Sequence, residues 1–158
     1  MNPDKTIILG LGNVLLNDEG IGVRTAEVLE KMTWPDGVEV LDGGTGGFVL
    51  LSLFQIYNNM IIIDASLTND PIGTVKVTEP RFSKDFPKSL STHELGLKDM
   101  IESAHLLEKV PRIFLITVSI NPQQDMDMKL SIEIEEKIPE IIRTVQSILK
   151  GTLGFKKI

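Results

Sequence analysis

The 158-residue sequence predicts an α/β protein: a three-layer α/β/α sandwich around a mostly parallel five-stranded sheet. Short apolar runs alternate with helical segments along the chain, which is the order expected of a parallel sheet. The run Met60–Ile63 has four consecutive apolar residues, as a central strand buried on both faces requires. Neither a linker nor a repeat interrupts the pattern, so we expect one compact domain over residues 1–158. Gly151 and Gly154 mark the segment from about residue 151 as a loose tail.

The strands are predicted from apolar segments bounded by glycine, proline or polar residues. The segment Thr74–Thr78 alternates between apolar and polar residues, which indicates an edge or antiparallel strand. The other segments are expected to form the parallel part of the sheet. In chain order, the predicted strands are Thr6–Leu11, Val38–Leu41, Asn59–Ile63, Thr74–Thr78 and Arg112–Ser119.

Helices are predicted between and after these strands, over residues of about 21–32, 48–54, 91–103 and 131–150. Asn17 or Asp18 is expected to cap the first helix. Ser91 and Glu94 form a capping box that opens the third. Pro139 lies inside the apolar pattern of the last helix, so we expect a kink or an interruption there.

The composition excludes several classes of function. A formal net charge of −6 argues against a nucleic-acid partner, because phosphate binding needs a basic surface. The absence of cysteine excludes disulfides, iron–sulfur clusters, thiolate zinc sites and a cysteine nucleophile. The N-terminal segment lacks the apolar region of a signal peptide, and no window approaches the length of a membrane span. We therefore expect a cytoplasmic protein without a membrane partner.

Carboxylate and imidazole side chains follow the predicted strands: Glu19, Asp42, Asp64 and His93. Ligands of open α/β sheets bind outside the carboxyl ends of the strands, where the strand order reverses. If the order begins 2-1-3, this crevice opens between the first and third strands. Glu19 then follows the first strand, Asp42 ends the second and Asp64 ends the third. All three carboxylates are expected in or beside one cleft.

The side-chain types indicate a site for a metal ion and for a peptide or a small ligand. Two carboxylates and an imidazole suit a borderline divalent ion such as nickel or zinc. His93 lies in the first turn of its predicted helix, where the helix dipole keeps the ring neutral, as a metal ligand must be. Glycines beside Asp42 allow another backbone to approach without side-chain obstruction, so a peptide fits there as well as a small ligand. These glycines are Gly43, Gly44, Gly46 and Gly47.

Each of these residues also has an ordinary structural explanation. Glu19 fits the acidic bias of helix N-termini, and Asp64 fits a cap on the following turn. Asp42 before two glycines is more often a turn former than a ligand, and a single histidine such as His93 more often lies on the surface. These explanations are the more frequent ones for single residues. The joint placement of the four side chains favours a site.

Motifs of other chemistries are incomplete. Gly10-Leu11-Gly12 follows a strand as in a dinucleotide-binding fingerprint, but Leu15 stands where the third glycine belongs. The sequence has no Gly-x-Ser-x-Gly elbow, no His-Glu-x-x-His helix and no Asp-Thr-Gly of an aspartic-protease dyad. Conventional hydrolytic machinery is therefore not visible.

Four segments are informative in combination: Leu9–Arg24 (LGLGNVLLNDEGIGVR), Leu41–Gly46 (LDGGTG), Ile63–Ala65 (IDA) and Ser91–Leu97 (STHELGL). Together they resemble the nickel–iron hydrogenase maturation endopeptidases. They occur in the order and at the spacing of that family, and the similarity extends over nearly the whole chain. The combination is highly specific, although any one segment would be weak.

The resemblance implies a three-layer α/β/α fold and a cytoplasmic peptidase, of a family often classed with the aspartic peptidases. Its members remove a C-terminal peptide from the precursor of a hydrogenase large subunit after nickel has been inserted. The resemblance assigns metal ligation to Glu19, Asp64 and His93. Asp42 is carried over as a catalytic or substrate contact within a glycine-rich recognition segment, whose other members are Gly43, Gly44, Thr45 and Gly46.

The implied mechanism uses nickel as a recognition element that the precursor carries, and other divalent ions are expected to substitute for it. Asp42 or a free oxygen of Asp64 then orients or deprotonates the attacking water, so both are expected to be catalytic. The alternative is a non-catalytic nickel-binding module for hydrogenase assembly, with the same ligands and no peptide cleavage. A third and weaker alternative is a nucleotide-binding oxidoreductase, based on the incomplete glycine fingerprint.

Overall fold

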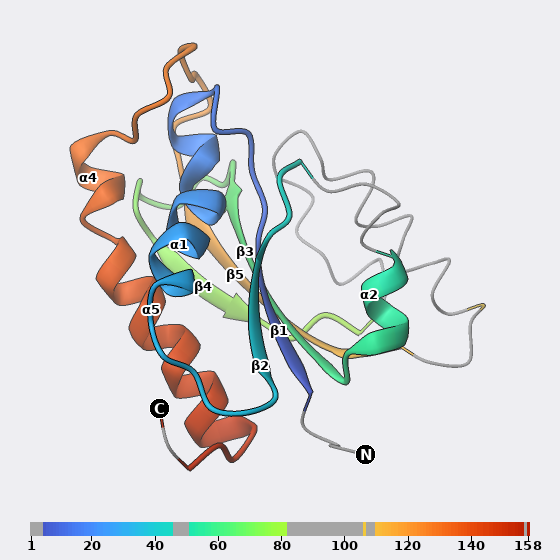
Figure 1. Cartoon of the computed structure of the whole chain (residues 1–158). Helices are drawn as coiled ribbons and strands as arrows, with labels where there is room; N and C mark the ends of the chain where they lie inside the picture. Colours follow the sequence, from blue (N-terminus) through green and yellow to red (C-terminus); the bar gives the residue numbers. More distant parts are fainter. Residues whose placement is uncertain (1–4, 46–50, 82–105, 107–109, 157) are drawn as a thin grey trace.

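The computed structural model describes residues 5–45, 51–81, 106, 110–156 and 158. A five-stranded sheet in the order β2-β1-β3-β5-β4 runs through the molecule (Figure 1). The strands are β1 (Thr6–Gly10), β2 (Val38–Asp42), β3 (Asn59–Ser66), β4 (Val75–Thr78) and β5 (Arg112–Ser119). The first four strands in that spatial order are parallel, and β4 pairs antiparallel to β5 at the edge. The predicted mostly parallel sheet, its 2-1-3 start and its antiparallel edge strand are confirmed.

Helices cover both faces of the sheet. The longer elements α1 (Ile21–Glu30) and α5 (Ile138–Ser147) lie on one face with α4 (Ile132–Glu135), and α2 (Leu51–Ile56) lies on the other (Figure 1). A 3₁₀ turn, η1 (Asn17–Gly20), precedes α1, and a π-helical turn, η4 (Ile148–Thr152), extends α5. This arrangement is the predicted three-layer α/β/α sandwich.

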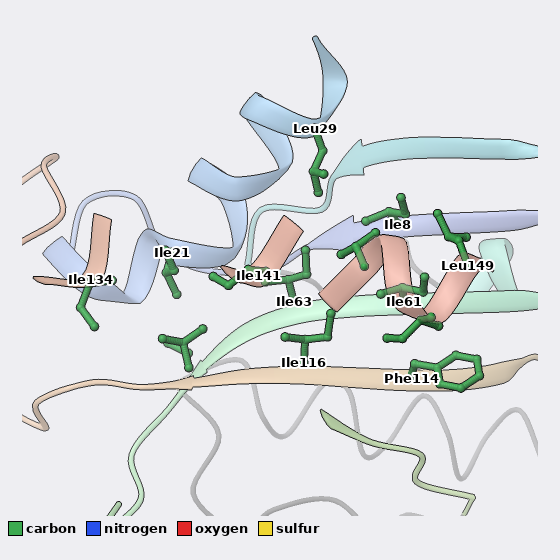
Figure 2. Packing of buried hydrophobic residues seen from close by; sticks show 14 of the residues in the cluster. Ile8, Ile21, Leu29, Ile61, Ile63, Phe114, Ile116, Ile134, Ile141 and Leu149 are labelled. Carbon is green, nitrogen blue, oxygen red and sulfur yellow. The ribbon is translucent and has the colours of Figure 1, made fainter. Parts of the chain in front are cut away.

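The core consists of two apolar clusters that the sheet separates. Because successive strand side chains point to opposite faces, Ile61 and Ile63 pack toward α1 and α5, whereas Met60 and Ile62 pack toward α2. Figure 2 shows the first cluster, where isoleucine and leucine side chains from the helices meet those of β1, β3 and β5. Each such side chain stabilises the fold by about 1.5–3 kcal/mol relative to an exposed position. The continuous apolar runs in the sequence are explained by this burial on both faces.

The last helical region is interrupted, as predicted. α4 ends at Glu135 and α5 begins at Ile138, with Pro139 in its first turn. Proline has no N–H to donate, and the first turn of a helix is where this donor is not needed. The Lys137 N–H bonds the Ile134 carbonyl at 3.0 Å, so a tight turn joins the two helices.

Three sequence-based expectations concern other parts of the chain. The helix expected over about 91–103 and the start of the one expected over about 48–54 lie outside the described residues. The segment from residue 151, expected to be a loose tail, contacts the core through Leu153 and Phe155. The Phe155 N–H also bonds the Leu149 carbonyl at 2.9 Å.

In the described ranges, no helix combines the length and the apolar character needed to cross a membrane.

Candidate functional site

The end of β1 lies at the centre of the carboxyl edge of the sheet and is held from both sides. The Leu11 N–H donates to the Ile63 carbonyl of β3 at 2.9 Å. On the other side, the Gly43 N–H donates to the Gly10 carbonyl at 2.9 Å, and the Gly12 N–H donates to the Gly44 carbonyl at 2.8 Å. The loops after β1 and β2 and the last residues of β3 are therefore fixed relative to one another.

Glycines allow η1 and α1 to pack directly on this edge. A Cβ on Gly22 would lie 2.1 Å from the Leu11 carbonyl oxygen and 2.3 Å from that of Ile63, so no side chain fits there. A Cβ on Gly12, whose φ is +152°, would lie 2.1 Å from the Glu19 carbonyl oxygen. Gly12 of the incomplete dinucleotide fingerprint is thus explained by internal packing, without a nucleotide.

This packing brings Glu19 and Asp64 to the same edge. Gly12 contacts the backbone of Glu19, the Leu11 N–H bonds the Ile63 carbonyl, and the turn η1 contacts β3. Both carboxylates are withdrawn from solvent, since Glu19 is 6% exposed and Asp64 is 0% exposed. Ionisable side chains are seldom buried to this degree unless they are paired, hydrogen-bonded or bound to a metal ion. Their burial distinguishes them from ordinary surface carboxylates.

Asp64 does not end its strand, which corrects the prediction. β3 continues to Ser66, because Asp64, Ala65 and Ser66 still pair with Thr117, Val118 and Ser119 of β5. The Asp64 Oδ1 atom accepts a hydrogen bond from the Ala65 N–H at 2.8 Å. Asp64 alternates with Met60 and Ile62, which places it on the face of the sheet that α2 covers.

Hydroxyl side chains share the edge and the face of the sheet with Asp64, and they were not predicted from the sequence. Ser66, Thr117 and Ser119 are all buried at this edge, on the same face as Asp64 by strand alternation and register. The Ser119 Oγ atom bonds the Thr68 hydroxyl at 2.8 Å, whereas the buried Ser66 Oγ has no hydrogen-bond partner among the residues that the structure describes. The sequence signal is two pairs of polar residues with a spacing of two, Asp64/Ser66 and Thr117/Ser119, at the ends of otherwise apolar strands.

Asp42 lies in different surroundings. It is the last residue of β2, as predicted, and its exposed carboxylate accepts the Gly44 N–H at 2.8 Å. It alternates with Val38 and Val40, which pack on the α1 side, so it lies on the opposite face of the sheet from Asp64. The expected single cleft for all three carboxylates is therefore not observed in the described residues.

Asp42 instead lines a separate hollow of about 200 Å³. Neither Glu19 nor Asp64 belongs to its lining, which consists of Gly12, Asn13, Val14, Leu15, Val23, Asp42, Gly44 and Thr45. Gly44 and Thr45 of the predicted recognition segment are thus placed together with Asp42. Gly43 is not, because it faces the other side, where a Cβ would meet the Leu11 and Leu9 side chains at 2.8 and 2.9 Å.

Asp18 and Asn17 do not cap α1, contrary to the prediction. Gly20 holds the N-cap position, and the Asp18 carboxylate accepts hydrogen bonds from the Ser131 N–H at 2.7 Å and the Ser131 hydroxyl at 2.9 Å. The Asn17 amide donates to the Lys129 carbonyl. Distant contacts satisfy these side chains, so they attach the loop after β1 to the segment that precedes α4.

The proposed metal-ligand set is only partly described. His93 lies outside the described residues, as does Gly46 of the recognition segment. Among the residues that the structure describes, no group of three or more His, Cys, Asp or Glu side chains is arranged to hold a metal ion. Of the three predicted ligands, Glu19 and Asp64 lie in the described part of the chain.

Known proteins share both the sequence and the fold. A sequence model described as hydrogenase maturation protease matches residues 23–148. The protein belongs to the hydrogenase maturation protease family. The hydrogenase 2 maturation protease of Escherichia coli strain K12 is 32% identical over 149 residues, which cover 90% of this chain and 91% of that protein. The enzyme class that follows from the family is a peptidase.

Solved structures of hydrogenase maturation proteases have the same architecture. The maturating endopeptidase HybD of E. coli superposes with a TM-score of 0.85 at 32% identity, covering 94% of this chain and 93% of that one. The NiFe hydrogenase maturation protease HybD of Thermococcus kodakarensis superposes with a TM-score of 0.75 at 26% identity, covering 91% and 98%. The family match includes Asp42, Asp64 and His93 but begins after Glu19, whose place in the site rests on the packing described above.

Proposed function

We propose that this maturation protease is an endopeptidase that removes the C-terminal peptide from the precursor of a nickel–iron hydrogenase large subunit. Cleavage follows nickel insertion, because the nickel ion in the precursor is the feature that the enzyme recognises. The proposal is supported by the family and by one observation above all. Glu19 of η1 and Asp64 of β3 are both buried at the carboxyl edge of the sheet, where η1 contacts β3.

The recognition step uses the chemistry of these ligands. Carboxylate oxygens and a neutral imidazole nitrogen suit a borderline divalent ion such as nickel. Glu19 and Asp64 bind the nickel of the precursor, and His93 completes the set. A precursor without nickel offers no cation to this edge, so its cleavage site is not brought into position. Other divalent ions with a similar preference for these ligands substitute for nickel in the precursor.

The hydrolytic step needs a water molecule and a group that accepts its proton. A metal-bound carbonyl is polarised, and a metal-bound water loses its proton more readily. The Ala65 N–H donates to Asp64 Oδ1 and so fixes the orientation of the carboxylate, which orients the water. Asp42 lies across the end of β1 from Asp64 and acts as a contact for the extended substrate together with Gly44 and Thr45.

The test compares nickel-loaded and nickel-free precursors of a hydrogenase large subunit, each incubated with the purified protein. The intact mass of the precursor is measured over time. We expect the loss of a C-terminal peptide from the loaded precursor only. Cleavage of both forms at equal rates would contradict nickel recognition. Binding of the loaded precursor without cleavage, for precursors of every hydrogenase class tried, would identify a non-catalytic assembly module instead.

A further inference from the structure

An apolar surface lies beside the Asp42 hollow, where the loop after β1 meets the segment before α4. Its most exposed members are Met126, Ile132 and Met128, which are 85%, 75% and 59% exposed. Leu15 and Val28 add to it at 51% and 38%. Large apolar side chains that gather on one exposed surface mark an interaction site more often than single exposed residues do.

This surface is hollowed, and its hollows and the one that contains Asp42 share lining residues in series. A second hollow, of about 460 Å³, is lined by Leu15, Met126, Asp127, Met128 and Lys129. It shares Leu15 with the Asp42 hollow. A third, of about 520 Å³, shares Met128 and Lys129 with the second and extends between α1 and the α4–α5 region. We call this series, from Asp42 to Ile138, the Met126–Met128 groove.

The backbone beneath the groove is held by several hydrogen bonds. The Asn17 N–H donates to the Asp127 carbonyl at 2.7 Å, and the Asp127 N–H donates to the Leu15 carbonyl at 3.1 Å. An Arg24 Nη2 atom donates to the Met128 carbonyl at 2.8 Å. The methionines are therefore presented by an ordered backbone, which lowers the entropic cost of binding a partner. Methionine side chains also adapt their shape to apolar partners.

The charges along the groove favour a cationic partner. Its lining has four acidic side chains and two basic ones, Arg24 and Lys129. Arg24 is occupied by an ion pair with Glu27 at 3.1 Å. The remaining acidic residues, Asp42, Asp127 and Glu135, outnumber Lys129. A second copy of this chain is a poor occupant, because each copy carries a net charge of −6.

We propose that the Met126–Met128 groove binds an apolar, cationic segment of the hydrogenase precursor and positions the precursor for cleavage. This inference rests on the proposed function, because the precursor is the partner in both. A groove that starts at Asp42 and leads away from the edge allows one chain to occupy the candidate site and the groove together. The groove then supplies affinity, and the carboxyl edge supplies recognition of nickel.

The test measures the affinity of nickel-loaded precursor for the wild-type protein and for the double variant Met126→Gln/Met128→Gln, by calorimetry. The matched control is Ile56→Gln/Val77→Gln, which changes two side chains that are each 46% exposed and lie outside the groove. We expect the groove variant to bind about tenfold more weakly or worse, a loss of about 1.4 kcal/mol or more, because two apolar contacts are lost. The control should bind as the wild type does. Equal affinity of the wild type and the groove variant, or no binding by either, would overturn the proposal.

Three further readouts separate the alternatives. Glu135→Lys should weaken binding, and stronger binding by this variant would refute a cationic partner. If the wild type associates with itself in sedimentation and the groove variant does not, then the occupant is a second copy and the proposal fails.

Cleavage is followed in parallel, and the substitutions of the groove variant should raise KM far more than they lower kcat. Groove-dependent binding without cleavage by the wild type would sink the peptidase function but keep the docking surface.

Discussion

Asp42 and Asp64 both stand at the carboxyl edge of the sheet, yet their surroundings suit different tasks. Asp64 is fully buried between strands, beside three hydroxyl side chains. Asp42 is exposed on the other face and lines an open hollow. A group that interacts with reacting atoms benefits from a fixed position away from water, whereas a substrate contact tolerates exposure. We therefore propose that Asp64 takes part in the chemistry and that Asp42 binds the substrate.

This assignment predicts different kinetic effects for two matched substitutions. Asp64→Asn should lower kcat for a nickel-loaded precursor by about 100-fold or more, because the amide no longer accepts a proton. Asp42→Asn should chiefly raise KM, by about tenfold, through the loss of a charged hydrogen-bond acceptor. Rates of C-terminal peptide release at several precursor concentrations separate the two parameters.

Asp36→Asn is the control, since Asp36 is an exposed turn residue before β2. It should leave both parameters unchanged. If Asp42→Asn lowered kcat as severely as Asp64→Asn, the two carboxylates would share the chemistry. A fully active Asp64→Asn protein would exclude Asp64 from it.

At the residue scale, the sequence predicts where a residue lies along its element better than it predicts which partner its side chain contacts. The pattern places Asp42 at the end of β2, as the structure confirms. It ends the third strand too early, because Ala65 and Ser66 are not the large β-branched residues that mark a strand, although pairing with β5 continues through both. Asp18 resembles a helix cap, but its partner, Ser131, is 113 residues away in sequence. Long-range partners of this kind leave no local signal.

At the scale of elements, the contacts of α1 with β1 and β3 hold η1, which contains Glu19, against the strand that contains Asp64. Gly22 makes this contact possible, since its missing side chain allows the helix to approach the Leu11 and Ile63 carbonyls. The two strands and the helix therefore behave as one unit at the carboxyl edge. A change that moves α1 outward should move η1 and Glu19 with it.

Gly22→Ala should lower the free energy of unfolding by about 3 kcal/mol, because the new methyl group must displace backbone atoms. It should also slow precursor processing. Gly151→Ala is the matched control, because Gly151 is also helical and a Cβ there meets nothing within 4 Å. Alanine is the better helix former by about 1 kcal/mol, so the control should be neutral or slightly stabilising. Denaturant titration measures both, and equal stability of the two variants would contradict the packing argument.

Element types follow from the sequence more reliably than their lengths. β5 begins and ends where the pattern predicts, because both of its faces are buried and the apolar run Ile113–Ile116 lies in its centre. Pro139 correctly predicts the interruption between α4 and α5, since proline removes a helix donor. The short turn η1 was not predicted, because its residues, Asn17–Gly20, resemble the cap of the following helix.

At the scale of the whole molecule, the edge opposite the site has its own polar contacts. The Tyr57 hydroxyl donates to the Glu39 carboxylate, which joins the residue after α2 to β2. The Lys5 ammonium lies 5.2 Å from the centre of the Tyr57 ring. Burial, with the Glu39 hydrogen bond and charge as further causes, raises the pKa of Tyr57 from 10.0 to about 12.

Because the pKa of Tyr57 is raised on folding, the folded state favours the neutral form of its hydroxyl. The resulting stabilisation is complete below pH 10.0, the ordinary pKa of tyrosine, and is lost as the pH rises through the folded pKa of about 12. Tyr57→Phe should therefore show a shallower decline of unfolding free energy across this range than the wild type. Tyr57 is the single tyrosine of the chain, so tyrosinate absorbance reports its titration directly. An absorbance midpoint near 10.0 would contradict the buried hydrogen bond.

The layer order of the molecule could be predicted because it depends on repeated patterns rather than on single contacts. Alternating strands and helices fix a parallel sheet, and crossovers of constant hand leave few topologies. The division of the carboxylates between two faces of the sheet could not be predicted, since it depends on strand register and on where β3 ends. The same is true of the Met126–Met128 groove, which forms where segments distant in sequence meet.

The most direct test of the central claim is a competition between nickel-loaded and nickel-free precursor for the wild-type protein and for Glu19→Gln. The two precursors are mixed in one reaction, and the ratio of their kcat/KM values is measured from the released peptides. We predict a strong preference of the wild type for the loaded precursor. Glu19→Gln should lower the rate on the loaded precursor toward that on the nickel-free form. If Glu19→Gln kept the full preference, the carboxyl edge formed by Glu19 and Asp64 would not be the nickel sensor.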